Sequence, residues 1–161
     1  MNIYVCIKQV PDTETKIKLT SENSAIDTTG VKWIVSPYDE FAIEETLRLR
    51  EKNPGSTVTV LSAGPARVVE AIRTALAMGA DNGIHVELPE GADNNLSAKA
   101  LAGALAKEAK IDYVFTGKEA IDDAAAQTSQ LIAEYLNLPV VTVVLNAEYG
   151  QGSVKCKREI E

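Results

Sequence analysis

The stretch that organises the chain runs from Ile111 to Thr128 and reads I-D-Y-V-F-T-G-K-E-A-I-D-D-A-A-A-Q-T. The run that ends at Phe115 is short and apolar, with β-branched and aromatic side chains, which predicts a buried parallel strand. Between Ala124 and Tyr135, apolar residues recur at helical spacing, which predicts an α-helix. A polar segment that begins at Gly117 joins the two. The stretch therefore predicts a strand, a glycine-led turn and a helix N-terminus.

A junction of this kind favours an anion site, because the first N–H groups of a helix lack partners and carry partial positive charge. Lys118 can neutralise a phosphate there or pair with an aspartate. Further donors can come from three nearby side chains: Gln127, Thr128 and Gln130. The alternative interpretation is that Asp122 or Asp123 simply caps the helix.

Composition limits the class of protein. The chain has 161 residues, 45% of them hydrophobic, which is enough for one globular domain with a real core. Its net charge of −7 disfavours nucleic-acid binding through the overall field. No apolar run approaches the roughly 20 residues that span a bilayer, so we expect no membrane insertion. The residues that follow Met1 enter a strand pattern directly, so we expect no signal peptide.

Strand and helix patterns alternate along the rest of the chain. We expect strands at Asn2–Val10, Thr57–Leu61, Gly83–Val86, Ile111–Phe115 and Leu138–Leu145, with an edge strand at Ser153–Arg158. We expect helices that begin after Ser36, near Val68 and near Leu96, besides the one at Ala124. Ser36 suits the N-cap and Pro37 the first helical position. A weak hairpin is expected from Lys16–Leu19 and Ile26–Val31.

Repeated strand–helix units predict an α/β fold, a Rossmann-like parallel sheet with helices on both faces. Ligands of such sheets bind beyond the carboxyl ends of the strands, where the strand order reverses. We expect the first and fourth strands to flank that crevice. Three strand exits should then converge on one pocket, and such a pocket suits an adenine nucleotide: Cys6–Val10, Ser62–Pro65 and Thr116–Asp123.

The sequence shows no set of catalytic residues. It has no recognisable nucleophile–base pair and no Walker motif, which favours a binding role over an enzyme. Asp122 and Asp123 are magnesium-type ligands without an apparent third partner. Cys6 and Cys156 lie far apart and form no metal motif, so we expect free thiols, and we expect a structural role for the single histidine, His85.

Four stretches, in order, resemble the β subunit of electron transfer flavoprotein and together cover essentially the whole chain. They are V-C-I-K-Q-V-P-D-T at Val5–Thr13, S-P-Y-D-E-F-A-I-E-E at Ser36–Glu45, R-T-A-L-A-M-G-A-D at Arg73–Asp81 and G-K-E-A-I-D-D-A-A-A-Q-T at Gly117–Thr128. The resemblance implies a domain like the adenine nucleotide alpha hydrolases. It also implies a heterodimer with an α subunit that binds the redox-active FAD. The complex takes electrons from acyl-CoA or other dehydrogenases and passes them to a quinone oxidoreductase.

In the common branch of this family, the β subunit buries an AMP as a structural ligand. Carried over by position, the resemblance assigns the AMP contacts to Cys6, Ser36, Pro37, Tyr38, Asp39, Ala63, Gly117, Lys118, Glu119, Ala120, Ile121, Asp122, Asp123, Ala124, Ala125, Ala126, Gln127 and Thr128. Two positions depart from the common pattern: Ser36 stands where Asn is usual, and Ala124 often corresponds to a third Asp.

Three alternatives remain open. In a bifurcating branch of the family, the same pocket holds a second FAD, but Asp122-Asp123 and Gln127-Thr128 fit the AMP branch better. A stand-alone nucleotide-binding regulator of the universal-stress type would need a G-x-x-G phosphate signature after the fourth strand. An adenylating enzyme would need S-G-G-x-D-S after the first strand, where this chain has Lys8-Gln9-Val10-Pro11.

The resemblance also bears on the extent and location of the chain. Family members continue beyond Glu161, so we expect residues 1–161 to be a single nucleotide-binding domain that lacks the family's C-terminal segment. That segment would carry the recognition loop for dehydrogenases and an arm around the α subunit. We expect a bacterial or archaeal cytoplasmic location, with the mitochondrial matrix as the second choice.

Overall fold

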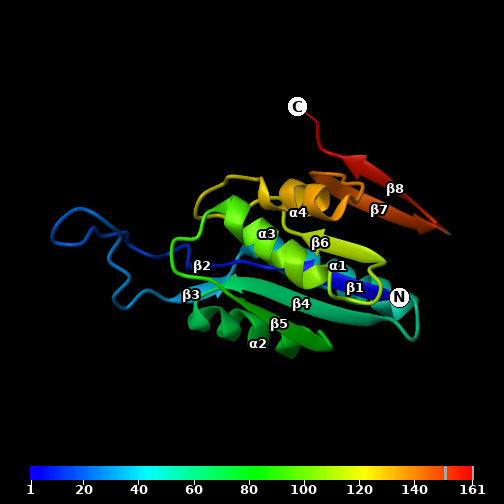
Figure 1. Cartoon of the computed structure of the whole chain (residues 1–161), viewed down its shortest axis with the longest axis horizontal. Coiled ribbons are helices and arrows are strands. Elements are labelled where there is room, and N and C mark those ends of the chain that lie inside the picture. Colours follow the sequence, from blue (N-terminus) through cyan, green and yellow to red (C-terminus); the bar gives the residue numbers. More distant parts are fainter. Residues whose placement is uncertain (151, 161) are drawn as a thin grey trace.

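A four-stranded parallel sheet forms the centre of the computed structural model, which describes residues 1–150 and 152–160. Figure 1 shows the arrangement of the elements. The strands of the central sheet lie in the order β5-β4-β1-β6, with bounds Asn82–Glu87, Thr57–Gly64, Asn2–Cys6 and Tyr113–Thr116. The helices are α1 (Pro37–Lys52), the 3-10 turn η1 (Ala66–Val68), α2 (Val69–Met78), α3 (Asn94–Leu105) and α4 (Thr128–Leu136).

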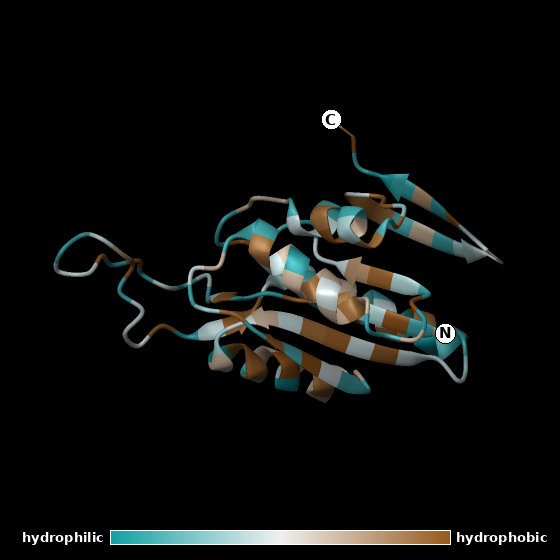
Figure 2. Ribbon diagram, viewed as in Figure 1, coloured by the Kyte–Doolittle hydropathy of each residue, from teal (hydrophilic) through white to brown (hydrophobic). Residues whose placement is uncertain are grey.

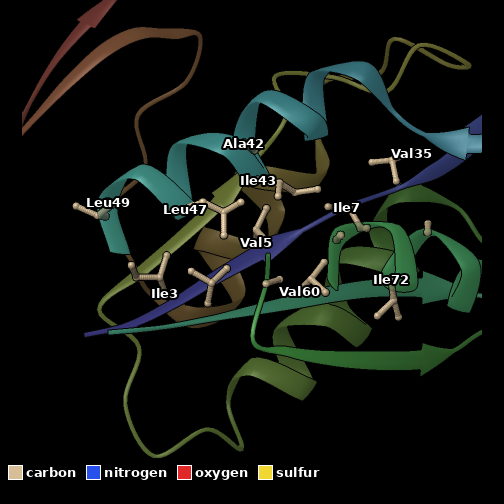
Figure 3. Close-up of a cluster of buried hydrophobic side chains, with 14 residues drawn as sticks. Ile3, Val5, Ile7, Val35, Ala42, Ile43, Leu47, Leu49, Val60 and Ile72 are labelled. Carbon is tan, nitrogen blue, oxygen red and sulfur yellow. The ribbon is translucent and has the colours of Figure 1, made fainter. Parts of the chain in front are cut away.

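Helices cover both faces of this sheet, as the sequence predicts. The side chains of β1 alternate between the faces: Ile3 and Val5 pack with α1 and α2, whereas Tyr4 and Cys6 pack with α3 and α4. Figure 3 shows the first of these layers, in which α1 lies over β1. Figure 2 shows hydrophobic residues alternating with paler ones along β4. The α/β class and the Rossmann-like arrangement are therefore confirmed.

The helix that follows Ser36 has the expected inner face. Ala42, Ile43, Thr46 and Leu47 are buried, and Pro37 occupies the first helical position. Asp39 and Glu40 lie in the first turn and Arg50 and Lys52 in the last, an arrangement that suits the helix dipole.

The first predicted strand is shorter than expected. It ends at Cys6, and Gln9–Pro11 form a separate strand, β2, which pairs antiparallel with β3 (Trp33–Val35). The expected hairpin between them is reduced to a single bridge that joins Leu19 and Ile26. Figure 1 shows residues 12–32 as an arm that extends away from the body. The alternation that suggested strands there is not supported by packing, because Leu19 and Ile26 are more than half exposed.

The predicted strand Leu138–Leu145 is wrong over residues 138–143. In the described part of the chain, regular structure ends at Leu136 and resumes only at β7 (Val144–Gly150), which pairs antiparallel with β8 (Ser153–Arg158). Val143 has a φ of 54°, which interrupts an extended conformation. The β-branched residues before Val144 pair with no strand in the described part of the chain, and Val140 and Val141 are about half exposed.

The β7–β8 hairpin packs on the central body through one aromatic residue. The Tyr149 ring meets the Tyr113 ring of β6 edge-on, with 5.6 Å between centroids, and its hydroxyl donates to Glu45 Oε1 of α1 at 3.1 Å. The predicted edge strand Ser153–Arg158 is thus confirmed as a strand, but its partner is β7 rather than the central sheet.

The strand exit expected at Ser62–Pro65 is instead mostly strand, because β4 continues to Gly64 and pairs with β5 from Thr59 to Gly64. No helix within residues 1–150 and 152–160 is long and apolar enough to cross a membrane.

Candidate functional site

A cavity of about 620 Å³ opens at the carboxyl edge of the central sheet. It lies where the strand order reverses, because β1 has β4 on one side and β6 on the other. Its wall includes residues from all three strand exits that the sequence singles out: Cys6–Gln9, Ala63–Pro65 and Thr116–Ala120. The prediction that these exits share one pocket is confirmed.

The cavity brings together most of the residues that the resemblance assigns to AMP. Those on its wall are Cys6, Asp39, Ala63, Gly117, Lys118, Glu119, Ala120, Asp122, Asp123, Ala125, Ala126, Gln127 and Thr128. Five others are not on the wall: Ser36, Pro37, Tyr38, Ile121 and Ala124. Gln130, expected to add a donor, is also off the wall.

A buried carboxylate ties the edges of the cavity together. Asp39, in the first turn of α1, accepts hydrogen bonds from the backbone N–H of Lys8 at 2.7 Å and of Gly117 at 2.9 Å. Lys8 follows β1 and Gly117 follows β6, so one side chain joins two strand exits to a helix N-terminus. Burial raises the pKa of Asp39 to about 7, although both amide hydrogen bonds and the Lys8 charge act to lower it.

Gly117 makes this contact possible because it has no side chain. A Cβ at this position would lie 2.5 Å from Asp39 Oδ1, 2.8 Å from the Tyr38 carbonyl carbon and 2.9 Å from the Asp39 nitrogen. Two of these three atoms belong to the backbone and have little freedom to move. The glycine that opens the polar segment is therefore required by close approach to α1.

Lys8 is the centre of a second set of contacts. Its backbone carbonyl accepts from Ser36 N at 2.9 Å, so both polar groups of its peptide are held by the start of α1. Its Nζ donates to Asp122 Oδ1 at 2.8 Å and to Asp123 Oδ2 at 3.0 Å. The sequence analysis noted Lys8 only as a residue of the turn and assigned it no role. The available signal in the sequence was a lysine directly after an apolar run, together with two adjacent carboxylates, Asp122 and Asp123, after a second strand.

The segment before α4 differs from the prediction in a way that shapes the site. The helix begins at Thr128 rather than Ala124, because Ala124 and Ala126 have φ values of 48° and 50° that a right-handed helix excludes. Its N-cap residue is Gln127, with no side-chain hydrogen bond to the helix among the described residues. Asp123 does not cap α4, since its Oδ1 accepts from the nearby Ala125 N.

This N-terminus faces the cavity, whose wall includes Gln127, Thr128 and Ser129. An uncapped helix start presents unpaired N–H groups and the positive end of the helix dipole. The helix start from which the sequence predicts an anion site therefore faces the cavity, although the helix begins four residues later in the chain than expected.

Ser36 behaves differently from a conventional N-cap. It is the N-cap residue of α1, but its hydroxyl makes no hydrogen bond to the helix, and Ser36 Oγ is buried without a partner among the described residues. Its backbone supplies the useful contacts instead, through its N–H to Lys8 and its carbonyl oxygen, which accepts from Asp39 N at 2.8 Å.

A cluster at the mouth of the cavity was missed by sequence reasoning. The Arg67 guanidinium stacks 3.5 Å above the Trp33 ring, donates to Gln9 Oε1 at 2.7 Å and pairs with Glu90 at 2.7 Å. These contacts fasten the base of the arm to η1 and to the loop before α3. The one tryptophan of the chain, Trp33, was the available signal.

The two cysteines and the histidine are the remaining titratable candidates. Cys6 is buried, and burial raises the pKa of its thiol to about 12, which makes it a poor nucleophile. Cys156 is a half-buried free thiol. His85 Nε2 lies 2.8 Å from the carbonyl oxygen of Gly64. No group of three or more metal-ligating side chains gathers within residues 1–150 and 152–160.

Comparisons with known proteins identify the family of this chain. A family model described as the electron transfer flavoprotein domain matches residues 24–161. The chain belongs to the electron transfer flavoprotein family. It is 42% identical to the electron transfer flavoprotein subunit beta of Bos taurus over 164 residues, which cover 100% of this chain and 64% of the relative. Subunits of the same name from Dictyostelium discoideum and Syntrophomonas wolfei are each 40% identical and are covered to 64% and 63%.

The resemblance to β subunits is therefore confirmed over the whole of this chain, which spans about 64% of the length of these relatives. The cavity lies in the part of the sequence that this chain shares with these relatives.

Gly117→Ala should destabilise the chain by about 1–3 kcal/mol, because the added methyl group meets backbone atoms of α1. Urea unfolding measures this change. Gly103→Ala is the matched control, since a Cβ at this position in α3 meets nothing within 4 Å and alanine favours a helix by up to about 1 kcal/mol. Equal unfolding free energies for the two variants would contradict the close contact.

Asp39 should make stability depend on pH. Its pKa of about 7 in the folded chain exceeds the ordinary value of 3.8, so between these values the folded state binds a proton that the unfolded state lacks. The free energy of unfolding contributed by this group is therefore largest below about pH 4 and falls as the pH rises towards about 7.

Asp39→Asn has no titrating group, so the decline should be smaller in this variant when urea unfolding is followed from pH 4 to pH 8. The free energy of unfolding of the variant should also be lower by about 1–3 kcal/mol, because one backbone N–H would then face the amide NH₂ donor of the asparagine. Parallel pH profiles for the wild type and Asp39→Asn would rule out the titration of Asp39 in this range.

Proposed function

We propose that this chain is the β subunit of a heterodimeric electron transfer flavoprotein that binds AMP as a structural ligand. It pairs with an α subunit that carries FAD, and the complex accepts electrons from acyl-CoA or other dehydrogenases and delivers them to a quinone oxidoreductase. In this role the chain is an electron-carrier subunit rather than an enzyme. Membership of the family and the names of its relatives support the proposal.

One observation carries the ligand assignment. The uncapped start of α4 and the exits of β1, β4 and β6 all face the same cavity. Backbone N–H groups at Thr128 and Ser129 suit a phosphate, and the Thr128 hydroxyl adds a side-chain donor. Apolar residues on the wall suit a planar base: Cys6, Ala63, Val68 and Leu101. The two requirements of a nucleoside monophosphate are thus met in one cavity.

This chain contributes a nucleotide-binding domain that holds its partner-binding form. When bound, FAD supplies the electron-accepting chemistry, and we assign it to the α subunit. The AMP in this chain would tie together the β1 exit, the β6 exit and α4, because each contributes residues to the cavity wall. A ligand that bridges these elements stabilises the folded chain in proportion to its affinity. We therefore propose that AMP keeps the domain in the form that the α subunit recognises.

The direct test is to denature the purified protein and to identify the released nucleotide by mass spectrometry. We expect AMP at close to one per chain. FAD would overturn the assignment of a structural ligand and would make this cavity a redox site of the bifurcating type. Release of neither compound would overturn the assignment of an adenine nucleotide to the cavity.

Gln127→Leu together with Thr128→Val should lower the AMP affinity about tenfold or more, because two polar side chains at the phosphate end are lost. Titration calorimetry measures the affinity. The matched control combines Gln130→Leu with Thr74→Val, which make the same changes at exposed positions away from the cavity wall. Equal AMP affinity in the two double variants would refute the placement of the phosphate.

A further inference from the structure

Each of the three basic residues on the cavity wall already has an acidic partner. Lys8 pairs with Asp122 and Asp123 at 2.8 and 3.0 Å, and Arg67 pairs with Glu90 at 2.7 Å. The Lys118 ammonium lies 3.6 Å from Glu119 and 4.8 Å from the centre of the Tyr38 ring. A phosphate that enters the cavity must therefore compete with carboxylates for every one of these positive charges.

Acidic residues outnumber basic ones on this wall by seven to three. The acidic residues are Asp27, Asp39, Glu90, Asp93, Glu119, Asp122 and Asp123. Four of them accept hydrogen bonds from backbone N–H groups: Asp27 from Thr29, Asp39 from Lys8 and Gly117, Asp93 from Leu96, and Asp123 from Ala125. These hydrogen bonds hold the carboxylates in place, and even without Asp39, whose pKa is raised to about 7, six acidic residues face three basic ones. The cavity is therefore negative overall.

The Lys8 ammonium is held between two carboxylates, so a phosphate must displace both to bind it. The backbone N–H and carbonyl of Lys8 are both bonded to the first turn of α1, so only the side chain can move. Because Asp122 and Asp123 each share Lys8, removal of its charge would leave two uncompensated carboxylates side by side. A single phosphate can be met by the backbone N–H groups of α4, but a chain of phosphates finds no unpaired basic side chain on the described wall.

We propose that this negative wall is a charge filter that selects nucleoside monophosphates over di- and triphosphates, and that Asp122 and Asp123 are the residues that determine this specificity. The inference rests on the proposed binding of a nucleotide in the cavity. Each added phosphate brings more negative charge towards side chains that are only about one-third exposed, where water screens it incompletely. The selectivity thus arises from repulsion of the wrong ligand rather than from added contacts with the right one.

The test compares AMP with ATP by titration calorimetry on the full chain, together with any partner subunit that co-purifies. The ligand-free protein is used in chelator-containing buffer without magnesium, so that ATP keeps its full charge. The variant combines Asp122→Asn with Asp123→Asn. The matched control combines Glu44→Gln with Glu70→Gln, which removes two acidic partners of exposed ion pairs on the outer faces of α1 and α2.

We expect the wild type and the control to bind AMP at least about tenfold more tightly than ATP. The Asp122→Asn and Asp123→Asn variant should narrow this ratio about fivefold or more, mainly through tighter ATP binding. An unchanged ratio would overturn the charge filter while leaving AMP binding intact. A wild type that binds neither nucleotide would overturn the proposed function itself, so the two failures are distinguishable.

A measurement on the wild type alone covers the case in which the double variant does not fold. Salt screens partly exposed charges, with a Debye length of about 10 Å at 0.1 M and about 3 Å at 1 M. The ratio of ATP to AMP dissociation constants should therefore fall as salt is raised from 0.05 to 0.5 M. A ratio that is constant over this range would contradict an electrostatic origin of the selectivity.

Discussion

The site depends on the buried carboxylate of Asp39. It replaces the water that the amides of Lys8 and Gly117 would otherwise need, and it does so from a helix on one face of the sheet. Removing a carboxylate from water is unfavourable, which is why burial raises its pKa to about 7. The structure offsets this cost with two backbone hydrogen bonds at the positive end of α1. This contact joins the exits of β1 and β6, between which the crevice lies.

The close contact of Gly117 with α1 and the ion pairs of Lys8 follow from the same arrangement. Because Asp39 lies against the exit of β6, only glycine fits at position 117. Because the peptide of Lys8 is fixed, its side chain projects from a rigid base and holds Asp122 and Asp123. The loop that leads to α4 is thus anchored at its start, by Gly117 to α1, and near its middle, by its carboxylates to Lys8. The uncapped start of α4 faces the cavity as a consequence.

The sequence predicts the architecture well because hydrophobic periodicity records burial. The central strands and all four α-helices follow from it, and so does the convergence of three strand exits. The prediction fails where apolar residues have no packing partner, as in Leu138–Leu145, and where backbone angles outweigh helix propensity, as at Ala124 and Ala126. Local patterns contain no information on such tertiary effects.

The candidate site shows the same division. Most of the residues that the resemblance assigns to AMP lie on the wall. The resemblance assigns Asp39 to the ligand, and the structure shows in addition that Asp39 bonds to the backbone of two strand exits. The partners of Lys8 and the stack of Arg67 on Trp33 join residues far apart in sequence, so no local pattern could have paired them. Pairwise charge geometry, from which the selectivity argument is built, becomes visible only in the folded chain.

The measurement that tests the central role of Asp39 most directly is amide hydrogen exchange, followed residue by residue by NMR. If the carboxylate binds the Lys8 and Gly117 amides, both should exchange with protection comparable to that of the β1 and β6 core amides, although both lie beyond the ends of the strands. Exchange of these two amides at the rate of unstructured loop residues would contradict the account.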